Sequence, residues 1–142
     1  MLALIHDRLS AVLPQPPFSG VEIAEDIDAL ASRAGLVESG TVILMPWKER
    51  AGPQMLATGG HRQKVETQFA VGIVIRHYDQ LMGGERAVQF DSFKTSVEAA
   101  LAGWEPADAS PCELIGGESS PISTGVSIYV QTWTTTRFLT GA

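Results

Sequence analysis

The sequence is poor in the features that mark several large classes of protein. Its single cysteine, Cys112, excludes an internal disulfide and a cysteine-based metal cluster. No apolar run approaches the 18 or more residues that a membrane-spanning helix needs. Ten Lys and Arg residues stand against sixteen Asp and Glu residues, and the net charge of −6 argues against a general nucleic-acid binder. The first 17 residues lack a basic start, so we expect no secretory signal and a soluble protein of a reducing compartment.

Catalytic and ligand-binding signatures are also scarce. His6, His61 and His77 are far apart and form no HExxH or His-x-His pair. Cys112 lacks a local nucleophile signature, and the three Gly-Gly pairs match neither GxGxxG nor GxxxxGK[ST]. We therefore expect no enzyme, no cofactor and no metal site. A site assembled only in three dimensions stays open: a polar pocket around His77 or Cys112 would favour it, and an apolar filled core would argue against it.

The most informative stretch is QKVETQFAVGIVIRHY, residues 63–78. With a period of two, one face is mainly apolar throughout, whereas the other begins polar and turns small or apolar near Phe69. This pattern predicts one long β-strand that is half-exposed in residues 63–68 and covered on both faces in residues 69–75. A strand of about 14 residues spans roughly 45 Å and projects beyond the core of a chain of this size.

The other elements follow from local periodicity, capping residues and turn signals. We expect a single domain over residues 1–142, with α+β architecture and a mostly antiparallel sheet of four to five strands with helices packed on it. In the last predicted helix, Phe93 and Trp104 belong to the apolar face. The predicted helices cover residues 2–13, 27–34 and 90–104, the predicted strands cover 21–23, 41–45, 113–117 and 126–138, and polar turns cover 79–84 and 119–123.

The segment WKERAGPQMLATGGHR, residues 47–62, has neither helical nor strand periodicity and is predicted to be a loop. Loops of this length within a compact domain tend to be functional or disordered. Because it leads straight into the long strand, we expect a long hairpin or loop arm at about residues 47–64 that is flexible and projects past the core.

Charge is distributed unevenly between this arm and the rest of the chain. Residues 47–64 carry a net charge of +3, which leaves −9 for the other residues. A basic arm and an acidic body favour a head-to-tail contact between identical chains, which closes into a ring when the rotation allows. Apolar side chains in such an arm support this interpretation, because Trp and Met are enriched at interfaces. The candidate interface residues are Trp47, Lys48, Arg50, Met55, Arg62, Gln63 and Lys64.

The order and the residue composition of several segments resemble those of a known family. These are an amphipathic N-terminal helix, VILMP (42–46), a Gly-rich polar loop, QKVETQFAVGIVIR (63–76), ALAGWEP (100–106), ELIGGES (113–119) and YVQTWTTTRF (129–138). Over nearly its full length, the chain resembles the tail terminator (tail completion, minor tail protein U-like) family of long-tailed bacteriophages.

The resemblance implies a non-enzymatic morphogenesis protein of a phage or prophage. Family members are α+β domains that form hexameric rings on the end of a completed tail tube, stop its polymerisation and offer a surface to head-completion proteins. The implied partners are further copies of the chain, the tail tube protein and a head-completion or connector protein, with no membrane and no sequence-specific nucleic-acid binding. The implied location is the host cytoplasm during assembly and then the virion. The alternatives are another head–tail connector or neck protein, or a small enzyme or ligand-binding α+β domain.

Overall fold

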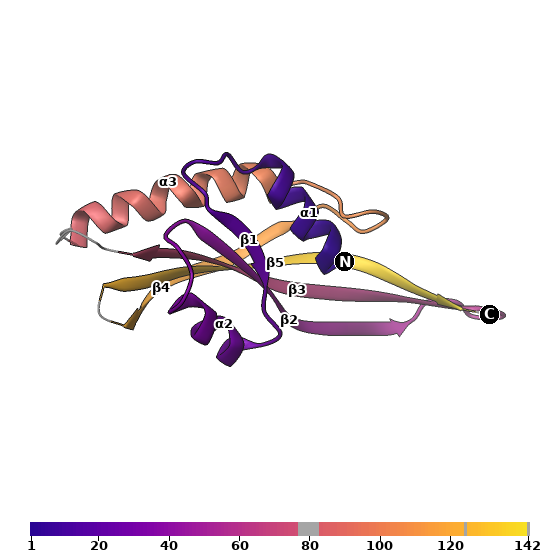
Figure 1. Cartoon of the computed structure of the whole chain (residues 1–142). Helices are drawn as coiled ribbons and strands as arrows, with labels where there is room; N and C mark the ends of the chain where they lie inside the picture. The colour runs from indigo at the N-terminus through magenta and orange to yellow at the C-terminus, as the bar shows by residue number, and fades with distance from the viewer. Residues whose placement is uncertain (77–82, 124, 142) are drawn as a thin grey trace.

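The computed structural model describes residues 1–76, 83–123 and 125–141. These residues form three helices and one five-stranded sheet (Figure 1). The helices are α1 (Leu2–Val12), α2 (Ile27–Ala34) and α3 (Gly83–Leu101), and the strands are β1 (Gly20–Ile23), β2 (Thr41–Gln54), β3 (His61–Arg76), β4 (Glu113–Ser123) and β5 (Val126–Gly141).

The sheet has the strand order β1-β2-β3-β5-β4. Strand β1 runs parallel to β2, and α2 lies in the crossover between them, as a parallel pair requires. All other neighbours are antiparallel. The predicted α+β class with a mostly antiparallel sheet is therefore confirmed.

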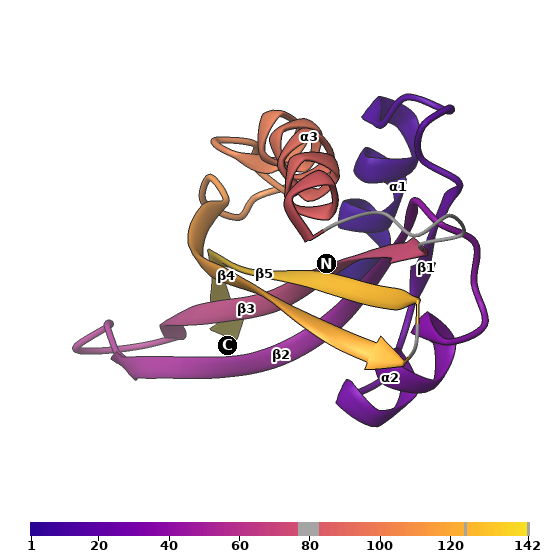
Figure 2. The ribbon, with the colours of Figure 1, turned by 90° about the vertical axis from the view of Figure 1, so that its left-hand side faces the viewer.

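The helices cover the sheet on both faces (Figures 1 and 2). Helices α1 and α3 pack on one face, where Phe69, Val71 and Ile73 of β3 belong to the buried cluster. Helix α2 packs on the other face, where Ala70 and Val74 belong to a second cluster. Because side chains alternate along a strand, β3 contributes to both cores with neighbouring residues.

Strand β3 changes character along its length, as its sequence predicts. Residues 69–75 are all buried, whereas among residues 61–68 only Val65 is buried. The structure places the strand two residues earlier than the predicted 63–78, from His61 to Arg76, and Tyr78 lies outside the described residues.

The predicted loop over residues 47–62 is wrong. Strand β2 continues to Gln54, β3 begins at His61, and only residues 55–60 connect the two strands. Pro46 and Pro53 obscure the strand pattern, but beyond Leu44 β2 has β3 as its only strand partner among the described residues. A proline on the edge of a sheet removes no ladder hydrogen bond when its nitrogen faces outward, and register shifts after Pro46 and Ala51 absorb the irregularity.

The predicted polar turn over residues 119–123 is also wrong, for a similar reason. Strand β4 continues through Pro121 to Ser123, with a register shift between these two residues. Strand β4 is the last strand of the sheet order, where proline and an irregular register are tolerated. The predicted turn at 79–84 falls mainly on residues that the structure does not describe.

Two aromatic residues of the predicted apolar helix face, Phe93 and Trp104, are only partly buried. Phe93 is half-buried and packs edge-on against Phe18, with ring centroids 4.8 Å apart. Trp104 lies beyond the last residue of α3 and is also half-buried, with the Arg8 guanidinium 5.5 Å from its ring centroid. The largest fully buried side chain among the described residues is instead Trp133 of β5.

Candidate assembly surface

Three strands extend together beyond the helices (Figure 1). We define the distal sheet as residues 47–54 of β2, 61–68 of β3 and 134–141 of β5, with the connection 55–60 at its end. Antiparallel pairing runs to that end, since Gln54 is opposite Gln63 and His61 is opposite Gly141. The sequence predicts a strand from residue 63 and another that ends at residue 138, but a loop over residues 47–62, and it does not reveal that β5 pairs with β3 along its whole length.

The two acidic side chains of the distal sheet are held within it. On one face, Glu49 accepts a charged hydrogen bond of 2.7 Å from Arg137 and a longer one of 3.4 Å from the Thr67 hydroxyl. On the other face, Glu66 accepts hydrogen bonds from the side chains of Gln68 and Thr134.

The environment of Glu66 favours the ionised form of its carboxyl group. The hydrogen bond from Gln68 is the main cause that lowers the pKa of Glu66, and the positive charges of Arg50 and Lys48 lower it further. These two cations lie close enough to act on Glu66 through space, without a direct ion pair between described residues.

The distal sheet is basic while the rest of the chain is acidic. It holds five of the ten Lys and Arg residues but two of the sixteen Asp and Glu residues, so its net charge is +3 against −9 for the remaining residues. Lys48, Arg50, Arg62 and Lys64 are exposed and form no ion pair with any described residue. Their charges are therefore available to an acidic partner.

The end of the distal sheet is organised by Gln54. Its amide oxygen accepts hydrogen bonds from the backbone N–H groups of Arg62 and Leu56, and its amide nitrogen donates to the Gly60 carbonyl oxygen. Gly59 and Gly60 adopt positive φ angles, which glycine allows without a steric penalty. The sequence alone does not reveal this role of Gln54, because it depends on the register of the two strands.

All seven predicted interface residues lie on the distal sheet or its connection. Trp47 and Met55 are about half exposed, at 51% and 54%. Arg62 places its guanidinium carbon 4.0 Å from the ring centroid of Phe138, which anchors the side chain but leaves it exposed. Gln63 differs from the others, because its amide nitrogen donates to the Gly52 carbonyl oxygen and its amide oxygen contacts His61 at 2.6 Å. Gln63 therefore has an internal role, and the interface role of all seven stays a prediction.

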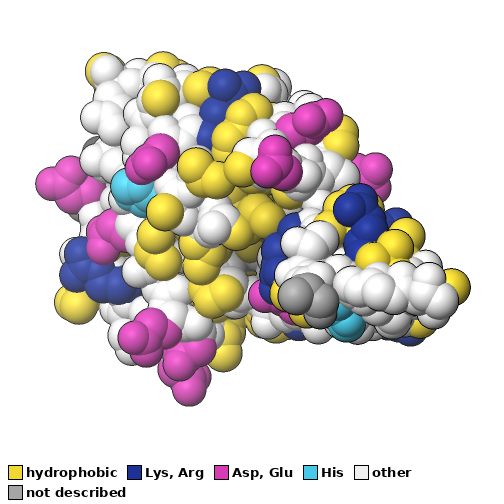
Figure 3. Space-filling model, turned by 90° about the vertical axis from the view of Figure 1, so that its right-hand side faces the viewer, with side chains coloured by type: hydrophobic (Ala, Val, Ile, Leu, Met, Phe, Trp, Pro, Cys, Tyr) yellow, Lys and Arg dark blue, Asp and Glu magenta, His cyan; other side chains and the backbone are white. Residues whose placement is uncertain are grey.

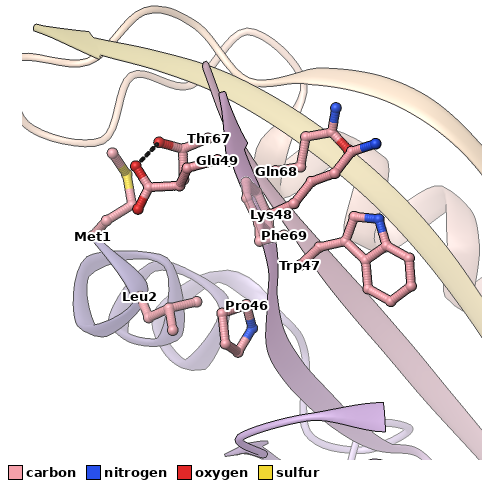
Figure 4. Close-up of a pocket in the computed structure, with 9 residues that line it drawn as sticks. All are labelled: Met1, Leu2, Pro46, Trp47, Lys48, Glu49, Thr67, Gln68 and Phe69. Carbon is pink, nitrogen blue, oxygen red and sulfur yellow. Dashed lines mark hydrogen bonds between the residues drawn. The ribbon is translucent and has the colours of Figure 1, made fainter. Parts of the chain in front are cut away.

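A hollow of about 340 Å³ lies at the base of the distal sheet (Figure 4). It follows the edge of β2 at the bulge after Pro46. In Figure 4, Met1 and Leu2 of the N-terminal segment lie on one side of the strand, and Trp47 and Lys48 lie on the other. The hollow is mainly apolar and offers no arrangement of acid, base and nucleophile.

The residues that sequence analysis considers for catalysis do not form a site in the described parts of the chain. Cys112 is buried in the apolar cluster under α1 and α3, and this burial raises the pKa of its thiol to about 11. The His6 imidazole contacts the Val21 carbonyl oxygen at 3.0 Å, whereas His77 is not described. In residues 1–76, 83–123 and 125–141, no group of three or more His, Cys, Asp or Glu side chains is placed to hold a metal ion.

No helix within the described residues is long and apolar enough to cross a membrane. A family model described as phage tail terminator protein matches residues 1–141. No curated protein matches the chain.

Proposed function

The chain belongs to the phage tail terminator family, and we propose that it forms a ring that caps the end of the tail tube. In this proposal, the ring stops the polymerisation of tube subunits and offers the surface to which head-completion proteins bind. The family supports the broader statement that the chain is a structural protein of phage tail assembly and belongs to the virion. We further propose that the ring has six copies, that it forms in the host cytoplasm and that it has no enzymatic activity.

The observation that carries the ring proposal is the charge contrast within one molecule. The distal sheet has a net charge of +3, and four of its cations are exposed and have no ion pair with a described residue, whereas the rest of the chain has a net charge of −9. Two different surfaces of opposite charge on identical chains favour a heterologous contact, which closes into a ring or continues as a filament. Electrostatic complementarity sets the orientation of such a contact more than its affinity.

Capping requires that the two faces of the ring differ. A heterologous ring has unlike faces, because every copy points in the same direction around the ring axis. One face then matches the last ring of tube subunits, and the other binds a head-completion protein instead of a further tube subunit. Tail tube protein and head-completion protein are therefore the partners that we propose beside further copies of the chain.

The first experiment is a mass measurement on the purified chain by light scattering or native mass spectrometry. Six copies of a 15.2 kDa chain give a particle of about 91 kDa (6 × 15.2). A particle of twelve copies would favour a connector on the portal side and contradict the proposal. The measurement is repeated on tube-bound protein, since assembly can depend on the tube.

The second experiment tests capping directly. Purified tube subunits are polymerised with and without the chain, and tube lengths are measured by electron microscopy. We expect shorter tubes, with density for the chain at one end only. Tubes of unchanged length with no bound chain, together with a monomer in solution, would overturn the proposed function.

A further inference from the structure

The base of the distal sheet is an apolar groove around an open strand edge. A second hollow of about 260 Å³ lies on the other face of the sheet, and Trp47 lines both this hollow and the one of about 340 Å³. Figure 3 shows hydrophobic side chains gathered between the body of the molecule and the extending strands. We define the edge groove by five of the apolar residues that line these two hollows: Met1, Leu2, Ile27, Pro46 and Trp47.

The edge groove is open to a partner and is bordered by acid. Ile27 is 52% exposed, and its neighbours Glu25 and Asp28 are exposed as well. Glu118 of β4 lines the second hollow. Asp26, between these residues, has a structural role, because its carboxylate accepts the 2.8 Å hydrogen bond from the Ala29 N–H that caps α2. Glu25 and Asp28, which are close to Ile27 in the sequence, are exposed and have no side-chain hydrogen bond to a described residue.

The far end of the distal sheet has the opposite character. Met55 and Leu56 in the connection, with Phe138 and Leu139 on β5, are exposed apolar side chains. The exposed cations Arg62 and Lys64 lie on β3 next to them, since Lys64 is opposite Phe138 in the sheet register. This end is thus apolar and basic. The edge groove is apolar and has more acidic than basic side chains: Glu118 lines its second hollow, Glu25 and Asp28 are close to Ile27 in the sequence, and Lys48 lines its first hollow.

The far end cannot reach the groove of its own chain. Residues 47–54 place it roughly 23 Å from Trp47 at 3.3 Å per residue, and pairing of three strands holds the sheet extended. A second copy of the chain carries the groove that this far end lacks within its own chain.

We propose that the far end of the distal sheet of one copy docks into the edge groove of the next copy. This inference rests on the proposed ring and names the contact that builds it. Met55 and Leu56 enter the apolar groove, and Arg62 and Lys64 face Glu25 and Asp28. The contact is heterologous, so each copy donates one far end and receives another.

Disulfide cross-linking tests the geometry. In a Cys112→Ala background, Leu56→Cys protein is mixed with Ile27→Cys protein under mild oxidation, in solution or on tube ends. A disulfide requires Cα atoms within about 7 Å, so only a close contact gives a covalent dimer. We expect dimers in the mixture and none with either variant alone. Leu36→Cys is the matched control, because Leu36 is 75% exposed and lies beyond the other end of α2.

Charge exchange tests the pairing independently. Reversal of Glu25 and Asp28 to Lys, or of Arg62 and Lys64 to Glu, is expected to raise the concentration for half-assembly roughly tenfold. The protein that carries all four reversals is expected to regain most of the assembly, which a general loss of stability would not allow. Glu38→Lys with Glu105→Lys is the control, because both side chains are exposed and the charge change is the same.

The outcomes separate this inference from the proposed function. If the parent chain assembles and shortens tubes, but Leu56→Cys cross-links no better to Ile27→Cys than to Leu36→Cys and the four reversals do not restore assembly, the docking contact is wrong and the ring stands. If the parent chain neither assembles nor shortens tubes, both proposals fail.

Discussion

The two halves of β3 belong to one continuous strand but are stabilised in different ways. In residues 69–75, both faces are covered by helices, and every side chain is buried. In residues 61–68, the strand lies between β2 and β5, most side chains are polar, and only Val65 is buried. Residues 69–75 are held by apolar burial, whereas residues 61–68 are held by backbone pairing and polar cross-strand contacts.

This difference shows how a small domain can present a stiff extension. An isolated two-stranded hairpin is marginal in water, and a third strand adds a second row of cross-strand hydrogen bonds. The chain adds that third strand by carrying β5 as far as Gly141, opposite His61. Pairing of three strands therefore holds the distal sheet extended although it has no core of its own. Its surface can then carry charged side chains and exposed apolar side chains.

Trp133→Ala is expected to cause the largest loss of stability, because Trp133 of β5 packs beside the buried residues of β3. Trp133 is fully buried in the cluster under α1 and α3, at the point where β5 passes Phe69. Loss of this ring leaves a large cavity, and we expect unfolding to become easier by about 3–5 kcal/mol. Urea denaturation followed by circular dichroism gives the value. A loss below about 1 kcal/mol would show that this core is not what stabilises the fold.

Two glycines, one just before β2 and one just after it, differ in the space around their backbone. Gly40 has a φ of +86°, and an added Cβ would lie 2.5 Å from the Pro17 carbonyl oxygen. Gly59, in the connection of the distal sheet, has a φ of +61° and open space around a Cβ. We expect Gly59→Ala to cost about 1 kcal/mol from backbone strain alone, and Gly40→Ala to cost roughly 3 kcal/mol because backbone must also move. Equal melting temperatures of the two variants would contradict this difference.

Substitution of two valines on the same face of β3 compares the stability that each half of the strand contributes. Val71 is part of the buried cluster under α1 and α3, whereas Val65 is buried between its strand neighbours Ala51 and Arg137. We expect Val71→Ala to cost about 2 kcal/mol, from two lost methyl groups and a rigid cavity. Val65→Ala is expected to cost about 1 kcal/mol, since its surroundings can relax. A larger loss at Val65 would mean that the distal sheet has a core after all.

The smallest effect on stability is expected from the surface charges of the distal sheet. Lys48, Arg50 and Arg62 are exposed and unpaired among the described residues, so reversal of all three to Glu should change stability by about 0.5 kcal/mol or less per site. The same variant should lose ring formation or tube capping, which light scattering and tube-length measurement report. A triple variant that assembles and caps like its parent would remove the electrostatic part of the proposed function.

Some features followed from local sequence, and particular residues show why others did not. The alternation from Phe69 to Ile75 is a local pattern, and it correctly predicts a strand covered on both faces. Pro46, Gly52 and Pro53 break the same kind of pattern in β2, so the sequence predicts a loop where the structure has a strand. The candidate interface residues are predicted from charge, apolar character and position. Gln63 differs from the others because its amide nitrogen donates to the Gly52 carbonyl oxygen across the hairpin, a contact that depends on strand register.

The sequence by itself determined the α+β class, the change along β3 and the contrast between a basic segment and an acidic remainder. These properties depend on side-chain spacing and composition, which are fixed residue by residue. The tertiary structure alone decided that β2 stays extended past Pro46, that β5 forms the third strand beside β3, and that Trp47 lies over an open edge between two hollows. The physical reason is that strand pairing joins residues far apart in the chain, so hydrogen bonds from β3 hold residues in β2 extended where local preferences favour a loop.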